Sequence, residues 1–167
     1  MFLDRDGVLN ARPPEHEYVM SADQFDWLPG AREAVVQLKR AGWKVAVVSN
    51  QRGVARGLVS PETLAEIEQR MQADLGPEAA LDGFFYCPHD LDESCDCRKP
   101  RPGLIVRAAA ELGVEPGGSW MIGDDESDIA AGRAAGCSTI LIAPDRDSTD
   151  APDLVEPDLA AAARRLC

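Results

Sequence analysis

Short apolar runs alternate with amphipathic segments along most of this 167-residue chain. An apolar run that ends in turn residues is typical of a strand buried on both faces of a parallel sheet. Apolar residues spaced three or four apart are typical of a helix that packs one face on such a sheet. This pattern predicts strands at residues 1–3, 44–49, 83–86, 119–122 and 138–142. It predicts helices at residues 31–41, 61–75, 103–112, 127–135 and 154–166.

The order of these elements predicts the fold class. Strands and helices alternate along the chain, so we expect an α/β fold, a doubly wound parallel sheet with helices on both faces. Residues 10–28 show no clear period, and we expect them to form an ordered loop beside the first strand. We expect residues 1–167 to form a single domain. In such a sheet, ligands bind at the carboxyl ends of the strands.

The composition narrows the classes of partner. The formal net charge is −12, which argues against nucleic acid and anionic membranes, because both attract a basic surface. No apolar run reaches membrane-spanning length, and the first residues lack the pattern of a signal peptide. We expect a cytoplasmic protein, and we expect it to be a monomer. An acidic chain can still bind a small phosphorylated metabolite if its basic residues gather at the site.

Two acidic residues stand at the end of the first apolar run. Asp4 ends this run, Asp6 follows one residue later, and Gly7 permits the chain to curl so that both carboxylates face the same way. Like charges at this separation repel, and a divalent cation shared by both side chains would remove the conflict. A carboxylate that attacks phosphorus and a second carboxyl that holds a proton suit phosphoryl transfer. The alternative is a strand end followed by an Asp-Gly turn.

Polar residues also follow two later strands. Ser49 and Asn50 could donate hydrogen bonds to phosphate oxygens, or they could serve only in a turn or cap. Asp124 could complete the cation site at the end of the first strand, because carboxylate oxygens suit Mg²⁺. Asp125 and Asp128 come at the start of the next predicted helix, where the helix dipole favours acidic residues that have no further role.

A basic pair, Arg98 and Lys99, follows the third predicted strand after a loop. Lys99 could hold phosphoryl oxygens and offset the charge of a carboxylate nucleophile. The alternative is a solvated pair of surface charges. The chain lacks the Gly-x-Gly-x-x-Gly and Gly-Lys-Ser/Thr loops, so binding of dinucleotides and nucleoside triphosphates loses support.

Three cysteines and one histidine lie within eleven residues: Cys87, His89, Cys95 and Cys97. Three thiolates and one imidazole fill a tetrahedron, so the cluster predicts Zn²⁺ in a closed, structural site. Such an ion would tie down a loop of low hydrophobic content that leads directly into the basic pair. Disulfides or free thiols are the alternative, and a reducing compartment disfavours disulfides.

Together these clusters resemble those of the haloacid dehalogenase-like phosphatases. The resemblance rests on the order of the acidic pair, the Ser-Asn pair, the lysine and the Gly-Asp pair along most of the chain. The chain resembles a narrower group in three stretches: Asp-Arg-Asp-Gly-Val-Leu-Asn, Ser-Asn-Gln-Arg-Gly-Val-Ala-Arg-Gly, and Cys-Pro-His with Cys-Asp-Cys-Arg-Lys-Pro. That group contains phosphatases of heptose 1,7-bisphosphate and of histidinol phosphate. The resemblance implies a Rossmann-like core with minimal cap insertions and a zinc-binding loop.

The resemblance also implies a role for each matching residue. Asp4 would form an aspartyl-phosphate, and Asp6 would protonate the leaving alkoxide and then activate water. Ser49 and Lys99 would hold the phosphoryl group. The implied ligands are Asp4, the Asp6 carbonyl group and Asp124 for Mg²⁺, and Cys87, His89, Cys95 and Cys97 for Zn²⁺. The residues implied to face the substrate are Asn50, Arg56 and Arg98.

One residue departs from the pattern of this group. Asp125 stands where the heptose phosphatases often carry Lys, and this change would make the metal site more acidic. The resemblance implies a Mg²⁺-dependent phosphatase that removes the 7-phosphate of D-glycero-D-manno-heptose 1,7-bisphosphate, and histidinol phosphate is the alternative substrate. A zinc-stabilised binding module without catalysis is the alternative from a different class. The complete set of acidic residues and lysine argues against that module.

Overall fold

A single parallel sheet organises the computed structural model, which describes residues 1–14, 17–143 and 152–167. Its six strands lie in the order β3-β2-β1-β4-β5-β6, and every neighbouring pair is parallel. The strands are β1 (Phe2–Leu3), β2 (Ala46–Asn50), β3 (Gly83–Cys87), β4 (Trp120–Gly123), β5 (Ser138–Ile142) and β6 (Leu154–Glu156). The strand order reverses between β1 and β4, which is the point at which doubly wound sheets open a crevice for ligands.

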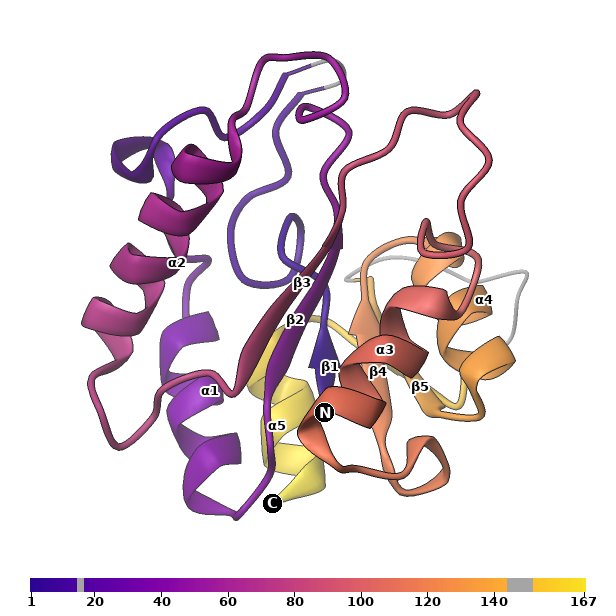
Figure 1. The fold of residues 1–167 in the computed structure, drawn as a ribbon. Coiled ribbons are helices and arrows are strands. Elements are labelled where there is room, and N and C mark those ends of the chain that lie inside the picture. The colour runs from indigo at the N-terminus through magenta and orange to yellow at the C-terminus, as the bar shows by residue number, and fades with distance from the viewer. Residues whose placement is uncertain (15–16, 144–151) are drawn as a thin grey trace.

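Helices cover both faces of the sheet, as the alternating pattern predicts (Figure 1). The helices are α1 (Ala31–Arg40), α2 (Pro61–Leu75), α3 (Gly103–Leu112), α4 (Glu126–Ala135) and α5 (Leu159–Leu166). Two short 3₁₀ helices, η1 (Ala22–Gln24) and η2 (Pro116–Gly118), lie in connections. Residues of α1, α2 and α5 form one apolar core with the sheet, and residues of α3 and α4 form a second core on the opposite face. The predicted fold class is therefore confirmed.

The central strand β1 is short but fully buried. Phe2 pairs with Ala46 of β2 and with Met121 of β4, and Phe2 and Leu3 face the two opposite cores. A strand that contacts apolar side chains on both faces needs no polar positions, which explains its continuous apolar run. Its burial fixes the position at which Asp4 leaves the sheet.

The end of the chain differs from the prediction. A single helix is predicted over residues 154–166, but β6 occupies Leu154–Glu156 and α5 begins at Leu159. Pro157 separates the two elements, and the Asp158 side chain caps α5 by accepting a hydrogen bond from Ala161 N at 2.7 Å. The other predicted boundaries agree with the structure to within two residues.

The connection from β1 to α1 corresponds to the predicted loop of residues 10–28, of which residues 15 and 16 lie outside the described part. Its described residues contain η1 and short bridges from Asn10 to Asp6 and Trp27. Within the described ranges, no insertion forms a separate cap over the sheet. The same ranges hold no helix that is both long and apolar enough to cross a membrane.

Candidate active site

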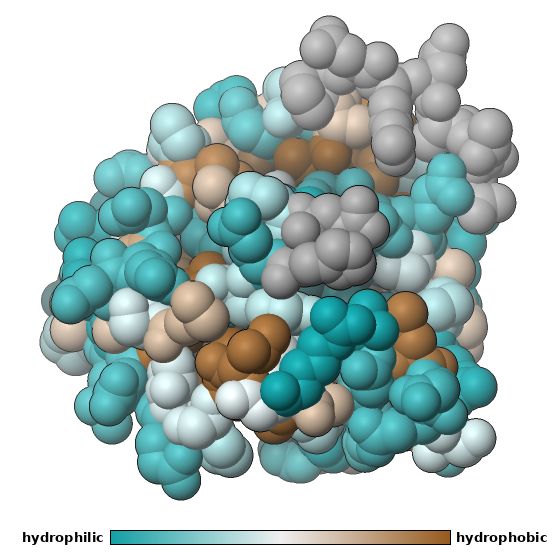
Figure 2. Space-filling model, turned by 90° about the horizontal axis from the view of Figure 1, so that it is seen from above, coloured by the Kyte–Doolittle hydropathy of each residue, from teal (hydrophilic) through white to brown (hydrophobic). Residues whose placement is uncertain are grey.

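A polar cavity of about 370 Å³ opens at the carboxyl ends of the central strands. Figure 2 looks down on this end of the molecule, where hydrophilic side chains predominate and apolar patches are smaller. The cavity is lined by side chains from the ends of β1 and β2, the segment at Lys99 and the start of α4. A larger hollow of about 680 Å³ lies beside it and has mainly apolar walls. Two aspartates, Asp4 and Asp128, line the smaller cavity together with Lys99.

Three carboxyl groups converge between the two hollows, because Asp4 and Asp128 line the smaller one and Asp124 lines the larger one. Oxygen atoms of Asp4, Asp124 and Asp128 all lie within 4.8 Å of one another. Lys99 Nζ lies 2.8 Å from Asp4 Oδ1 and 2.6 Å from Asp128 Oδ1, and it donates to the Val48 carbonyl oxygen at 2.9 Å. Among these groups the three carboxyls outnumber the one ammonium, so this cluster of hard oxygen ligands fits a divalent cation such as Mg²⁺.

Burial controls the protonation of this cluster. Lys99 is 3 % exposed, and although burial opposes its charge, the carboxylates of Asp128 and Asp4 raise its pKa above the usual value for lysine. Burial raises the pKa of Asp128 to about 7. The negative charges of Asp4 and Asp124 also raise this pKa, whereas the positive charge of Lys99 lowers it. Burial also raises the pKa of Asp124. A bound cation would therefore displace a proton from this cluster near neutral pH.

Asp128 is a site residue that the sequence reasoning assigned to the helix dipole alone. Its Oδ2 does accept a hydrogen bond from Asp125 N at 3.2 Å, as a capping box requires. Its Oδ1 meets Lys99, however, so the side chain serves the cap and the cavity together. An available signal was the position of Asp128 in the first turn of the helix directly after β4, because this turn lies at the carboxyl end of that strand, near Asp124.

Gly7 brings the turn after β1 against Asp124. Its φ is +93°, in the left-handed region that favours glycine. A Cβ atom at this position would lie 1.8 Å from Asp124 Oδ2. The curl predicted at Gly7 is therefore present, and it brings the ends of β1 and β4 into contact.

The Asp6 carboxylate is directed away from the acidic cluster. Its oxygens accept hydrogen bonds from Arg5 NH2 at 3.0 and 3.1 Å, from Asn10 Nδ2 at 2.8 Å and from Gln51 Nε2 at 3.2 Å. Arg5 is 1 % exposed, so its guanidinium forms a strong charge-assisted pair with Asp6. The expectation that the Asp4 and Asp6 side chains share one cation is not met by these positions, because the buried Arg5 holds the second carboxylate. The sequence reasoning also missed Arg5.

Residues at the end of β2 divide between the cavity wall and the structure behind it. Ser49 and Asn50 both line the cavity, and Ser49 Oγ accepts a hydrogen bond from Gln51 Nε2 at 3.1 Å. The Asn50 amide is bonded to the backbone of Lys99. Both side chains therefore stand where the sequence predicts them, next to the acidic cluster.

The two arginines predicted to face the substrate lie in different places. Arg98 lines the cavity, and its NH1 donates to the His89 carbonyl oxygen at 3.2 Å. Arg56 does not line this cavity, and its Nε lies 3.4 Å from Asp90 Oδ2 in the cysteine-containing loop. Arg52 pairs with the same carboxylate. Arg56 therefore joins two loops in this structure and does not contact the cavity.

Arg12 covers one side of the acidic cluster. Its NH2 lies 2.7 Å from Asp124 Oδ1 and its NH1 lies 3.5 Å from Asp125 Oδ2, while half of the side chain is exposed. Asp125 is the N-cap of α4 and accepts a hydrogen bond from Ser127 N at 2.9 Å. The added acidity expected from Asp125 is thus offset by Arg12 and by the amino end of the helix.

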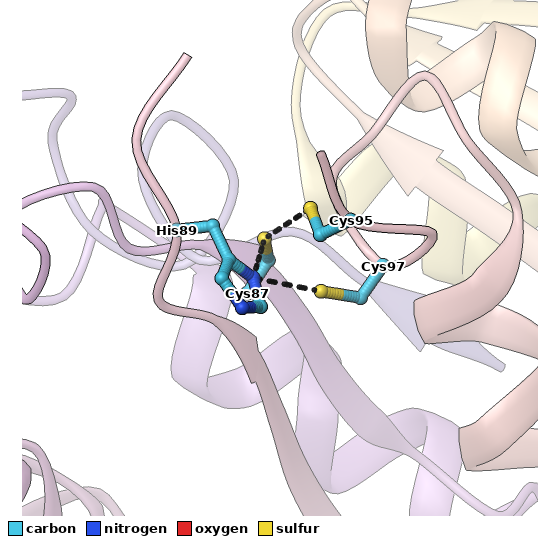
Figure 3. A group of neighbouring side chains, drawn as sticks. All are labelled: Cys87, His89, Cys95 and Cys97. Carbon is cyan, nitrogen blue, oxygen red and sulfur yellow. Dashed lines mark hydrogen bonds between the residues drawn. The ribbon is translucent and has the colours of Figure 1, made fainter. Parts of the chain in front are cut away.

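The predicted zinc ligands converge in the loop after β3 (Figure 3). Cys87 Sγ lies 3.8 Å from Cys95 Sγ and 3.5 Å from His89 Nδ1, and Cys97 Sγ lies 3.3 Å from the same nitrogen. A tetrahedron with Zn–S of ~2.3 Å and Zn–N of ~2.0 Å has edges of about 3.8 Å between sulfurs and about 3.5 Å between sulfur and nitrogen. These four side chains could therefore hold Zn²⁺ with little movement. The cysteines are not joined in disulfides.

Comparisons with known proteins agree with this geometry. A model of the HAD-hydrolase-like family matches residues 96–163. The chain is 40 % identical over 150 residues to D-glycero-beta-D-manno-heptose-1,7-bisphosphate 7-phosphatase of Pasteurella multocida, which covers 85 % of this chain and 80 % of that relative. The protein of the same name from Pseudomonas putida is 39 % identical over 99 % of this chain and 98 % of its own length.

A solved structure gives the same result. The D,D-heptose 1,7-bisphosphate phosphatase from B. bronchiseptica, complexed with magnesium and phosphate, superposes with a TM-score of 0.87 at 35 % identity, over 99 % of this chain and 96 % of that one. The chain therefore belongs to the haloacid dehalogenase-like phosphatases, in the family of these heptose bisphosphate phosphatases. The family resemblance inferred from the sequence is confirmed.

Proposed function

We propose that this chain is a Mg²⁺-dependent phosphatase that removes the 7-phosphate of D-glycero-D-manno-heptose 1,7-bisphosphate through an aspartyl-phosphate at Asp4. The observation that carries the proposal is the cluster of Asp4, Lys99, Asp124 and Asp128, of which Asp4, Lys99 and Asp128 are buried and line the polar cavity. The names of the relatives and of the magnesium-bound structural neighbour support the substrate and the ion.

The proposed reaction has two steps. A carboxylate oxygen of Asp4 attacks phosphorus, the bond from phosphorus to the sugar oxygen breaks, and the leaving alkoxide takes a proton from Asp6. Asp6 then accepts a proton from water, which attacks the acyl phosphate, releases inorganic phosphate and regenerates Asp4. Before the first step, Asp6 must leave Arg5, Asn10 and Gln51 and take up a proton from solvent, because the ion-paired carboxylate has no proton to donate.

Positive groups would stabilise the transferred phosphoryl group. We assign this role to the Lys99 ammonium and, as a hydrogen-bond donor, to the Ser49 hydroxyl. When bound by Asp4, the Asp6 carbonyl group and Asp124, Mg²⁺ would neutralise charge on the phosphoryl oxygens. Zn²⁺ on the cluster of Cys87, His89, Cys95 and Cys97 would have a structural role, since it would fix the loop that leads into Lys99.

The second phosphate of the substrate needs a separate cation. Arg98 lines the cavity and commits one nitrogen to the His89 carbonyl oxygen, so the rest of its guanidinium could receive that phosphate. We also propose that residues 1–167 act as one domain and as a cytoplasmic monomer. One sheet takes strands from Phe2 to Glu156, which favours the single domain.

The test is a substrate panel with the purified chain and Mg²⁺. We expect kcat/KM to be highest for heptose 1,7-bisphosphate, lower for other sugar phosphates and for histidinol phosphate, and lost in Asp4→Asn. A preference for histidinol phosphate would overturn the substrate, and an absence of Mg²⁺-dependent turnover on every phosphate ester would overturn the enzyme assignment itself.

A further inference from the structure

The lysine that lines the cavity belongs to an irregular segment of the chain. Lys99 lies in the segment after the zinc loop, outside any strand or helix, yet its ammonium must stay between Asp4 and Asp128. A lysine side chain is flexible and loses rotamer entropy when it is held, so a fixed backbone is needed to keep its ammonium in place. Another part of the chain must therefore fix the backbone of Lys99.

Asn50, the last residue of β2, binds both polar groups of the Lys99 backbone. Its Oδ1 accepts a hydrogen bond from Lys99 N at 3.1 Å, and its Nδ2 donates to the Lys99 carbonyl oxygen at 3.1 Å. Val48, two residues earlier in the strand, accepts from Lys99 Nζ at 2.9 Å. The end of one buried strand thus holds both the backbone and the ammonium of Lys99.

Only an amide of this length can make the paired contact. A carboxylate at residue 50 could not donate to the Lys99 carbonyl oxygen, and a hydroxyl would have to make both hydrogen bonds through a single oxygen on a shorter side chain. Both polar atoms of the amide already face the lysine backbone, which leaves neither directed at a substrate. This geometry differs from the substrate contact that the sequence predicts for Asn50.

We infer that Asn50 is a positioning residue that fixes Lys99 in the acidic cluster and does not recognise the substrate. The inference rests on the proposed function, because it assumes that Lys99 stabilises a phosphoryl group. It predicts that loss of the amide lowers the rate of the chemical step for every phosphate ester. It predicts no selective loss of affinity for the bisphosphate.

The chain contains a matched control for this contact. Gln72 in α2 makes the same pair of bonds with Leu81, with its Nε2 donating to the carbonyl oxygen at 2.9 Å and its Oε1 accepting from the backbone nitrogen at 2.9 Å. Gln72→Glu removes one donor from a paired amide contact that does not involve the cavity. Its effect on stability therefore reports what the same chemical change costs outside the site.

The experiment compares Asn50→Asp, Asn50→Ala and Gln72→Glu on p-nitrophenyl phosphate and on heptose 1,7-bisphosphate. Because a shift of about 1 Å in a reacting group can reduce a rate about 10²-fold, we expect kcat to fall about 10- to 100-fold in both Asn50 variants on both substrates. KM should change less than about threefold, and Gln72→Glu should keep wild-type kcat. In a Lys99→Met background, Asn50→Ala should cost little more, because the two residues act as one unit.

A second measurement does not depend on activity. Acetic anhydride labelling read by mass spectrometry should leave Lys99 unmodified in the wild type and in Gln72→Glu, and should modify it in the Asn50 variants. A rise in KM for the bisphosphate with an unchanged kcat on p-nitrophenyl phosphate would overturn the inference, as would Asn50 variants with a protected Lys99 and full activity. A wild-type chain that hydrolyses neither substrate would instead overturn the proposed function.

Discussion

Replacement of Lys99 by Met removes the ammonium group from a buried cluster but keeps an apolar side chain of similar length. The ammonium is in contact with Asp4 and Asp128, whose side chains are 10 % and 1 % exposed. Loss of one partner of a buried pair costs about 3–5 kcal/mol, because the remaining charge is left uncompensated. Proton uptake by the carboxyls can relieve part of this cost, so we expect a loss of about 3 kcal/mol in the free energy of unfolding near pH 8.

The pH dependence of this loss follows from the direction of the pKa change. The pKa of Asp128 is already raised to about 7, and removal of Lys99 would raise it further. A folded-state pKa above the unfolded value of ~3.9 means that stability falls as pH rises between the two values. The deficit of Lys99→Met against wild type should therefore be smaller near pH 6 than near pH 8.

The assay is denaturant unfolding without Mg²⁺ at both pH values, with Lys39→Met as the control. Lys39 Nζ lies 2.5 Å from Asp82 Oδ2 in a pair whose side chains are 15 % and 25 % exposed, so its loss should cost less than the loss of Lys99 at either pH. With Mg²⁺ present, Lys99→Met should also reduce turnover by about 10²- to 10³-fold. A Lys99 variant that resembles the Lys39 variant in stability at both pH values, or that retains near-wild-type turnover, would show that Lys99 neither compensates the buried carboxylates nor stabilises the phosphoryl group.

Three further predictions concern the metals and the turn after β1. Cys95→Ser should lose zinc and lower the melting temperature, because metal binding is coupled to folding; unchanged metal content by mass spectrometry would count against the site. Gly7→Ala should weaken Mg²⁺ binding in calorimetry by at least about tenfold, since its Cβ would collide with Asp124 at 1.8 Å; unaltered affinity would mean that the turn is not constrained. The pKa of Asp128 is raised to about 7, so the metal-free fold should lose stability as pH rises toward 7 and Asp128 loses its proton. The affinity for Mg²⁺ should increase over the same pH range, because the carboxylate formed attracts the cation. Asp128→Asn should remove this pH dependence in titrations with Mg²⁺.

The sheet could be predicted from the sequence because its strands are buried on both faces. Continuous apolar runs occupy residues 46–48 of β2 and 140–142 of β5, and the turn residues after them mark where each strand ends. The short edge strand β6 was missed because it has three residues, none of which is buried, so no apolar run distinguishes it from the helix that follows. Pro157 and Asp158 were the local signals of that boundary.

The candidate site could be predicted only in part, for a related reason. Strand topology brings Asp4, Ser49 and Asp124 to one edge whatever their partners are, so position in the sequence was enough to find them. The interactions of Arg5 with Asp6, and of Asp128 with Lys99, depend on side-chain directions and on burial, which a pattern of residues does not give. The roles inferred for these residues remain predictions until their variants are measured.

The proposed mechanism requires a phosphoryl group that is covalently bound to Asp4. The chain would be mixed with Mg²⁺ and heptose 1,7-bisphosphate, stopped within the first turnovers, reduced with borohydride and mapped by mass spectrometry. Because borohydride reduces an aspartyl-phosphate to homoserine, we predict homoserine at position 4 in the wild type and not in Asp4→Asn. Rapid turnover with no modification at position 4, or with the modification at another carboxylate, would contradict the assignment of Asp4 as the nucleophile.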